Sequence, residues 1–157
     1  MNALLICMQN ELTAMTSLVD VLGQEQAALT QAPSLELMEE INAITVTKNQ
    51  WINSLNQLGK ARKQALTRLG LGHVEQNLEL YLQDHDQRDC WSKLMAKTKK
   101  AKELNRVNGL LITRHLLRNQ STLEVLYQHH QHTNMPTLYG ANGQSNPQRS
   151  LIRGFGC

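Results

Sequence analysis

Apolar residues recur near the start of the chain at alternating spacings of three and four residues. They stand at Leu5, Met8, Leu12, Met15, Val19, Leu22 and Leu29. This spacing is typical of a heptad seam along one face of an α-helix. Pro33 lacks a backbone N–H and disfavours helix in the residue before it. The pattern therefore predicts one long helix from near Asn2 to Gln31.

A second heptad stripe follows the proline. It consists of Leu37, Ile41, Ile44, Lys48, Trp51, Leu55, Leu58, Arg62, Ala65 and Leu69. Ser34 is a favourable N-cap for this helix, and the acidic residues of the first turns complement the helix dipole. Lys48 and Arg62 interrupt the apolar stripe, and we expect their stems to cover it while their charged ends reach solvent. Gly70 and Gly72 predict where the helix ends.

The next residues predict a short helix and then a last long one. The short helix carries on one side Val74, Leu78, Tyr81 and Leu82. The long helix begins near Asp89 and ends near His129. Its apolar stripe consists of Trp91, Leu94, Met95, Ala101, Leu104, Val107, Leu111, Ile112, Leu116, Leu123 and Leu126. Asn105 and Asn108 interrupt this stripe. Because a buried amide is costly unless it is hydrogen-bonded, we expect the two asparagines to fix the register or to bond across the bundle.

Beyond His132 the sequence changes character. Residues 134–157 contain two prolines, four glycines and no sustained period, so they lack the apolar surface that would offset the entropy of ordering. The segment nevertheless retains large apolar residues, among them Leu138, Tyr139, Leu151, Ile152 and Phe155. We therefore predict an all-α fold: an elongated antiparallel helical bundle of three long helices plus a short one over residues 1–132, followed by a flexible, partner-binding C-terminal tail over residues 133–157.

Length and composition agree with this fold. A chain of 157 residues is the size of one domain, which buries about two-thirds of the surface of its unfolded form. Aromatic residues make up 4% of the chain and prolines number three, whereas leucine, glutamine, alanine, lysine and glutamate are abundant. This composition favours long helices over strands.

Charge is distributed unevenly along the chain. Residues 1–50 carry six acidic residues and one basic residue, whereas residues 88–118 carry nine basic residues and two acidic ones. This asymmetry favours an acidic and a basic helix that complement each other across one bundle. DNA binding is the alternative. The basic residues spread around the helix without a helix-turn-helix or an aromatic platform, so we predict no nucleic-acid partner.

The cysteines and the first residues indicate the compartment. Cys7, Cys90 and Cys157 have neither metal-ligand nor redox spacing, which favours reduced thiols in the cytosol. The apolar start of the chain lacks the basic segment of a signal peptide and is interrupted at Gln9. No apolar run approaches the roughly 18 residues of a membrane span. We therefore predict a soluble, cytoplasmic protein without membrane insertion.

Residues that carry catalytic or metal chemistry are sparse. The best metal candidates are His129, His130 and His132, but no acidic residue or cysteine stands at a spacing that completes a site. His115 is expected to pack on the apolar face. No nucleophile elbow or phosphate-binding glycine loop is present. The sequence predicts no cofactor, no metal and no enzymatic activity.

Two short motifs resemble those of the FlgN family of flagellar export chaperones. The first runs from Leu104 through Asn105, Asn108 and Gly109 to Ile112, and the second runs from Leu138 to Gln144. The similarity extends in outline over almost the whole chain, in its length, its helices and its polar tail. The chain departs from the family pattern in the basic, apolar extension over residues 145–157.

This resemblance implies a cytoplasmic chaperone that binds hook-filament junction proteins, keeps them unassembled and delivers them to the flagellar export gate. A partner helix lying in an exposed apolar groove is the expected recognition mode. The partner-binding residues would be Asn105, Asn108, Gly109, Leu126, Leu138, Tyr139, Gly140, Leu151, Ile152 and Phe155. Tyr139 would contact the export gate or pin the tail to the bundle, and Gly109 would allow close backbone packing or contact a partner. The alternative is a scaffold or regulatory protein that self-associates as a homo-oligomer through the same seams.

Overall fold

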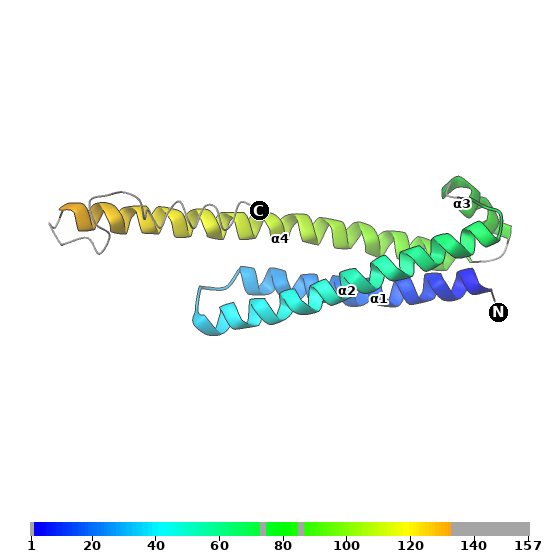
Figure 1. The fold of residues 1–157 in the computed structure, drawn as a ribbon, viewed down its shortest axis with the longest axis horizontal. Coiled ribbons are helices and arrows are strands. Elements are labelled where there is room, and N and C mark those ends of the chain that lie inside the picture. The colour runs from blue at the N-terminus through cyan, green and yellow to red at the C-terminus, as the bar shows by residue number, and fades with distance from the viewer. Residues whose placement is uncertain (1, 73–74, 85–86, 133–157) are drawn as a thin grey trace. The chain divides into compact units, whose positions relative to one another are not determined.

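The computed structural model describes residues 2–72, 75–84 and 87–132. Over these residues the protein is all-α, as the sequence predicts, with three long helices and one short one (Figure 1). The helices are α1 (Ala3–Leu29), α2 (Leu35–Arg68), α3 (Glu75–Asp84) and α4 (Arg88–His132). The predicted strand-free fold class is therefore confirmed for the described residues.

Local capping residues set the helix boundaries. The side chain of Asn2 accepts a hydrogen bond from the backbone N–H of Leu4 at 3.1 Å and begins α1. Ser34 begins α2 in the same way, at 3.1 Å from the N–H of Leu37. After α2 the chain enters the left-handed region at Gly70 (φ 72°) and Gly72 (φ 64°), a conformation that other residues rarely adopt.

The last helix is slightly longer than its sequence predicts. It begins at Arg88 rather than at Asp89, and it ends at His132 rather than near His129. Asp89 therefore lies in the first turn, where it pairs with Lys93 Nζ at 2.7 Å. An acidic residue at this position interacts favourably with the positive end of the helix dipole.

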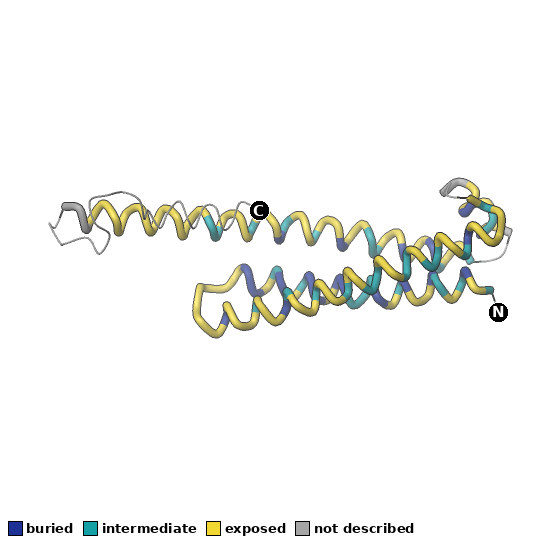
Figure 2. Tube along the Cα trace, viewed as in Figure 1, coloured by how far each residue is buried: buried dark blue, intermediate teal, exposed yellow. Residues whose placement is uncertain are grey.

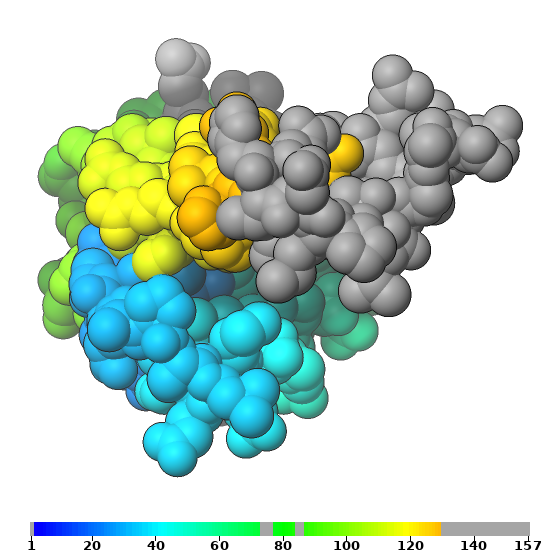
Figure 3. All heavy atoms as spheres, turned by 90° about the vertical axis from the view of Figure 1, so that its left-hand side faces the viewer, coloured from blue at the N-terminus to red at the C-terminus, as the bar shows by residue number. Residues whose placement is uncertain are grey.

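The chain divides into two compact units, residues 1–111 and residues 112–157. In the first unit, α1 and α2 form an antiparallel hairpin (Figure 1). Its connection, residues 30–34, is exposed throughout and forms part of the blue-to-cyan surface in Figure 3. The first part of α4 packs parallel to α1, because Leu94 lies in one core cluster with Leu4 while Asn108 bonds to Leu22.

Three apolar clusters form the core of this unit, seen as the dark-blue segments of α1 and its neighbours in Figure 2. The first cluster contains Leu4, Met8, Leu66, Leu78, Leu82, Trp91 and Leu94. The second contains Leu18, Val19, Leu22 and Ala101. The third contains Val21, Ala28, Leu37 and Ile44. Burial of this apolar surface is the main force that holds the helices together.

The short helix α3 closes the first cluster. Leu78 and Leu82 are 1% and 0% exposed, so the side of the helix predicted to be apolar faces the core. Tyr81 is partly buried beside the cluster, and its hydroxyl accepts a hydrogen bond from Asn2 Nδ2 at 3.1 Å. The position of Val74 lies outside the described residues.

The seam of α1 differs from the predicted one mainly in its first half. Met8, Val19, Leu22 and Leu29 are buried as predicted. Leu5 and Leu12 are only partly buried, and their neighbours Leu4 and Glu11 are buried instead. The observed heptad series is Leu4, Glu11, Leu18 and Glu25. Two glutamates occupy seam positions, so an apolar pattern alone displaces the seam by one residue.

The described part of the second unit consists of the end of α4, residues 112–132. Side chains from Leu117 to His129 are all exposed, which gives this stretch its yellow colour in Figure 2. These residues form no core of their own.

Candidate partner-binding surface

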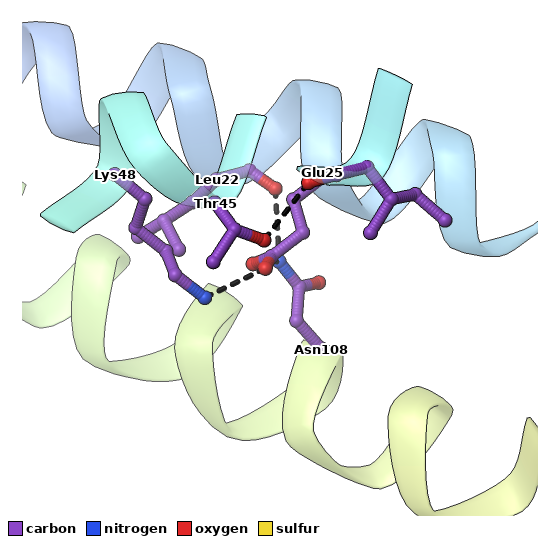
Figure 4. A network of polar contacts seen from close by, with 6 residues as sticks. Leu22, Glu25, Thr45, Lys48 and Asn108 are labelled. Carbon is purple, nitrogen blue, oxygen red and sulfur yellow. Dashed lines mark hydrogen bonds and ion pairs between the residues drawn. The ribbon is translucent and has the colours of Figure 1, made fainter. Parts of the chain in front are cut away.

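Asn108 joins α4 to α1 inside the bundle. The residue is 1% exposed. Its Nδ2 donates hydrogen bonds to the backbone oxygen of Leu22 at 3.0 Å and to Glu25 Oε2 at 2.8 Å (Figure 4). Its Oδ1 has no hydrogen-bond partner among the described residues. The expectation that this asparagine bonds across the bundle is confirmed, and a partner would reach the amide only if these contacts opened.

The other oxygen of Glu25 binds the hairpin partner of α1. Lys48 Nζ of α2 donates to Glu25 Oε1 at 2.6 Å, and the two side chains are 15% and 2% exposed. We call Glu25, Lys48 and Asn108 the first polar layer, since they join three helices at one level (Figure 4). Because the carboxylate accepts from both a cation and an amide, the cost of burying it is largely offset.

A second polar layer lies two heptads away and consists of Glu11, Arg62 and Trp91. Arg62 Nε donates to Glu11 Oε2 at 2.6 Å. The guanidinium lies over the Trp91 ring, 5.2 Å from its centroid, a cation–π contact that again includes α4. A Cβ at Gly59 would stand 3.4 Å from Glu11 Oε1, at ordinary van der Waals distance.

These layers correct one expectation. Lys48 and Arg62 do not extend to solvent; their charged ends turn inward to buried glutamates. The predicted complementarity between the acidic N-terminal region and basic α4 stays a prediction. The ion pairs of the two layers join α1 to α2, and Lys93 and Arg106 of α4 pair locally with Asp89 and Glu103.

Both layers obey one antiparallel register. From one layer to the next, α1 advances by two heptads, from Glu11 to Glu25, and α2 goes back by two heptads, from Arg62 to Lys48. Sliding α2 by one heptad would bring the glutamates opposite Leu55 and Ile41. Because an unpaired buried charge costs several kcal/mol, about 3 to 5 when one partner of a pair is lost, this slip is strongly disfavoured.

Burial makes the stability contributed by Glu11 depend on pH. Desolvation raises the pKa of the Glu11 carboxyl above its ordinary value of 4.5, and the nearby Arg62 only partly counteracts this. The folded state therefore binds the proton more tightly than the unfolded state. The stabilising contribution is full below pH 4.5 and declines as the pH rises through the raised pKa.

We expect Glu11→Gln, which resembles the neutral carboxyl, to lose this pH dependence. The free energy of unfolding of the wild type, measured by urea titration, should fall relative to that of the variant as the pH rises from 4.5 through the raised pKa of Glu11. Glu36→Gln is the matched control, because Glu36 is exposed. A wild type that gains stability over the variant as the pH rises would contradict the raised pKa.

The other two residues of the α4 motif face outward. Asn105 is exposed, so its predicted place inside the seam is wrong. Gly109 is also exposed, and a Cβ built there would meet no other atom within 4 Å. Close packing inside the bundle therefore does not explain this glycine, and the contact with a partner is the remaining hypothesis.

Replacing Gly109 by alanine should stabilise the protein. Glycine inside a helix costs about 1 kcal/mol relative to alanine, and the new methyl group has space. We expect the urea midpoint to rise at unchanged m-value, as it should for Gly23→Ala, whose Cβ also has nothing within 4 Å. A destabilised Gly109→Ala variant alongside a stabilised Gly23→Ala variant would show that the glycine has a structural role.

An exposed apolar face on α4 is a candidate for binding. We define the α4 strip as Ile112, Leu116, Leu123, Leu126 and Tyr127. Ile112, Leu123, Leu126 and Tyr127 are 37%, 45%, 51% and 47% exposed, and Leu116 is partly exposed. Their spacing places them on one side of the helix.

This strip has the heptad phase of a packing seam. Ile112 and Leu126 fall at the same heptad position as Trp91, which is 6% exposed in the core of the first unit. Leu117 and Val125 are exposed apolar residues too, but they point more than about 100° away from the centre of the strip. Of the strip residues, Leu126 is a predicted partner-binding residue. Ile112, Leu116 and Leu123 belong to the predicted apolar stripe without a predicted role in binding, and Tyr127 was not predicted.

Other predicted features have different outcomes. The predicted partner-binding residues of the tail, Leu138, Tyr139, Gly140, Leu151, Ile152 and Phe155, lie outside the described residues.

Among the described side chains, no group of three or more metal-binding residues occurs. The side chains of His130 and His132 do not belong to the described ones. His115 is partly buried. Cys7 and Cys90 are free thiols. No helix in the described ranges is both long and apolar enough to cross a membrane.

Comparison with known proteins identifies the family. A family model described as FlgN protein matches residues 1–147. The flagella synthesis protein FlgN of Proteus mirabilis is 31% identical over 144 residues, which cover 92% of this chain and 89% of that protein. Its counterpart in Escherichia coli K12 is 32% identical over 135 residues, 83% of this chain and 91% of that protein. No solved structure matches.

The fold and the exposed strip define a small helical-bundle protein with an uncovered amphipathic helix face. The chain belongs to the FlgN family. The resemblance that the two short motifs suggest is thereby confirmed over residues 1–147. The relatives are described as flagella synthesis proteins, which supports a role in flagellum assembly.

Proposed function

We propose that this protein is a cytoplasmic chaperone of flagellar type III export. It binds the helical termini of hook-filament junction proteins, keeps them unassembled and delivers them to the export gate. The α4 strip is the observation that carries this proposal, because it presents four exposed apolar side chains in heptad phase. Membership of the FlgN family and the description of its relatives as flagella synthesis proteins support the biological setting.

The physical basis of binding is the packing of one amphipathic helix on another. A partner helix that lays its own apolar side chains on Leu116, Leu123 and Leu126 removes both surfaces from water. Each large apolar side chain that becomes fully buried contributes about 1.5 to 3 kcal/mol. The mechanism needs no catalytic group and no cofactor.

Residues outside the strip have separate proposed roles. Asn105 and Gly109 are exposed on α4 and would extend the partner surface. In the tail, Leu138, Leu151, Ile152 and Phe155 would serve as apolar anchors for the junction protein. Tyr139, with Gly140, would contact the export gate once the junction protein is bound. A chain that ends at His132 and still captures a junction protein with full affinity would refute the role of the tail.

Titration calorimetry with purified proteins tests the function. We expect the chain to bind a hook-filament junction protein with a dissociation constant at or below about 1 μM, and to bind the filament subunit at least about a hundredfold more weakly, which corresponds to about 2.8 kcal/mol. In cells, deletion of the gene should abolish secretion of the junction proteins while hook assembly continues. Absence of binding to every junction protein would overturn the proposal.

Self-association is the second candidate, because the α4 strip would also suit a second copy of this chain. Light scattering separates the two. A chaperone forms a mixed complex in which the junction protein displaces any contact between copies, whereas a scaffold retains its own oligomeric state when the junction protein is added.

A further inference from the structure

A hollow of about 250 Å³ lies between α3 and the first turns of α4. Leu82 and Trp91 are 0% and 6% exposed and form its floor, whereas Met95 is 37% exposed and stands at its mouth. The polar residues that line it are Glu79, Gln83, Arg88 and Ser92. Small-molecule sites commonly measure about 300 to 1,000 Å³. A smaller hollow with an apolar floor therefore suits one or two apolar side chains of a protein partner.

A line of exposed residues continues from this hollow along α4. Its members follow one another at alternating spacings of four and three residues and are Arg88, Ser92, Met95, Lys99, Lys102 and Arg106. At about 100° per residue, they lie within about 80° of one another around the helix. Four of the six are basic, so part of the positive charge of α4 is gathered on one face. We call Arg88, Lys99, Lys102 and Arg106 the basic row.

The charges of the basic row are only partly compensated. Lys99 and Lys102 form no ion pair with an acidic residue in the part of the chain that the structure describes. Arg106 pairs with Glu103 at 2.7 Å, but the two side chains are 60% and 61% exposed. Exposed pairs of this kind are weak, because water and salt screen them. The row therefore presents positive charge to a partner that binds beside the hollow.

The apolar hollow and the basic row together select one kind of partner. A helix that lies along α4 from Arg88 to Arg106, over roughly 27 Å, would place an apolar side chain in the hollow and acidic side chains next to the row. A nucleic acid fits less well, because it has no apolar side chain for the hollow. In addition, Glu79 at the hollow and Glu103 beside the row would repel a continuous run of phosphates.

We propose that the hollow between α3 and α4, together with the basic row, binds an acidic amphipathic helix of another protein. This surface lies within residues 79–106 and shares no residue with the α4 strip. The inference therefore does not rest on the proposed function. It gives the chain a second binding surface, whose partner is recognised by its negative charge as well as by an apolar contact.

Fluorescence anisotropy with synthetic peptides and the full chain tests this surface. The probes are acidic helical peptides of about 18 residues, with glutamates at heptad spacing and with leucine, methionine or phenylalanine at the position that meets the hollow. We expect at least one of them to bind with a dissociation constant below about 100 μM at about 0.15 M salt. Lys99→Glu with Lys102→Glu should weaken this binding by about tenfold or more, since it places like charges opposite one another.

Lys93→Glu with Lys100→Glu is the matched control for charge. Both lysines are exposed on α4 and lie more than about 100° around the helix from the centre of the basic row. The same change of net charge should therefore weaken binding by less than about threefold. Met95→Ser tests the hollow and should weaken binding by about fivefold or more, because it removes an apolar contact. Circular dichroism should show unchanged helix content in all of these surface variants.

Several results would overturn the proposal. They are the failure of every peptide to bind, an equal loss of affinity in the two lysine pairs, and an unchanged affinity in Met95→Ser. Tighter binding of a DNA duplex than of the peptides would make the row a nucleic-acid site instead. Self-association of the wild type that Lys99→Glu with Lys102→Glu abolishes, measured by light scattering, would identify a second copy as the occupant. None of these experiments uses a junction protein, so the proposed function keeps its own test.

Discussion

Replacing Glu25 by alanine should lower the free energy of unfolding by about 3 kcal/mol or more. The carboxylate is buried and accepts hydrogen bonds from Lys48 Nζ at 2.6 Å and from Asn108 Nδ2 at 2.8 Å. Its removal leaves a largely buried ammonium without its counter-ion. Asn108 retains only the bond to the Leu22 oxygen, so α4 loses part of its attachment to α1.

Urea unfolding followed by circular dichroism measures this loss, with Glu36→Ala as the control. Glu36 is an exposed glutamate, whose replacement should change stability by less than about 0.5 kcal/mol. The double variant Glu25→Met with Lys48→Met should recover much of the loss, since well-packed apolar residues often replace a buried ion pair without net cost. Equal stability of Glu25→Ala and Glu36→Ala would show that the first polar layer contributes nothing.

Local signals let the sequence predict the helices well. Asn2, Ser34 and Gly70 act on residues within one turn of themselves, so their effect is visible without knowledge of the fold. The seam of α2 was also predictable from Leu37 to Ala65, because its apolar residues keep heptad spacing on both sides of Lys48 and Arg62. Its predicted last residue, Leu69, is 44% exposed, and Leu66 is buried instead. The structure confirms these features because they depend on neighbours in the chain.

The polar layers were not predictable in the same way. In the sequence, Glu11 and Glu25 cannot be told from exposed glutamates. Their partners Arg62 and Lys48 are distant in the chain and come opposite them only in the folded protein. A signal was nevertheless present. The two glutamates are two heptads apart, as are the two cations, and opposite charges at matching intervals in adjacent helices indicate paired layers. Counting only apolar residues hid this pattern and displaced the seam of α1.

The α4 motif shows the same limit. Asn105 and Asn108 are three residues apart and have the same chemistry, yet one is exposed and the other is buried against Glu25. The position of α1 against α4, which the short motif does not contain, determines which of the two asparagines is buried. Likewise, the apolar stripe of α4 runs from Trp91 to Leu126 in sequence, and periodicity alone does not tell that Trp91 is buried while Leu126 is exposed.

Substitutions in the α4 strip should abolish binding of a junction protein. We expect Leu116→Ser, Leu123→Ser and Leu126→Ser together to weaken the affinity by at least about a hundredfold, since truncation of a central apolar contact commonly costs about 2 kcal/mol or more. Leu123 and Leu126 are 45% and 51% exposed, so the stability of the first unit should remain unchanged. Titration calorimetry gives the affinity, and urea unfolding gives the stability.

A matched pair of substitutions on the opposite side of the helix makes the result specific. Leu117 and Val125 are 58% and 65% exposed, more than the strip residues, yet they lie outside its face. Leu117→Ser with Val125→Ser should therefore change the affinity by less than about threefold, although it too removes exposed apolar side chains from α4. If the two sets weaken binding equally, the partner recognises the general hydrophobicity of α4. If only the strip set weakens it, heptad phase decides which surface the partner helix covers.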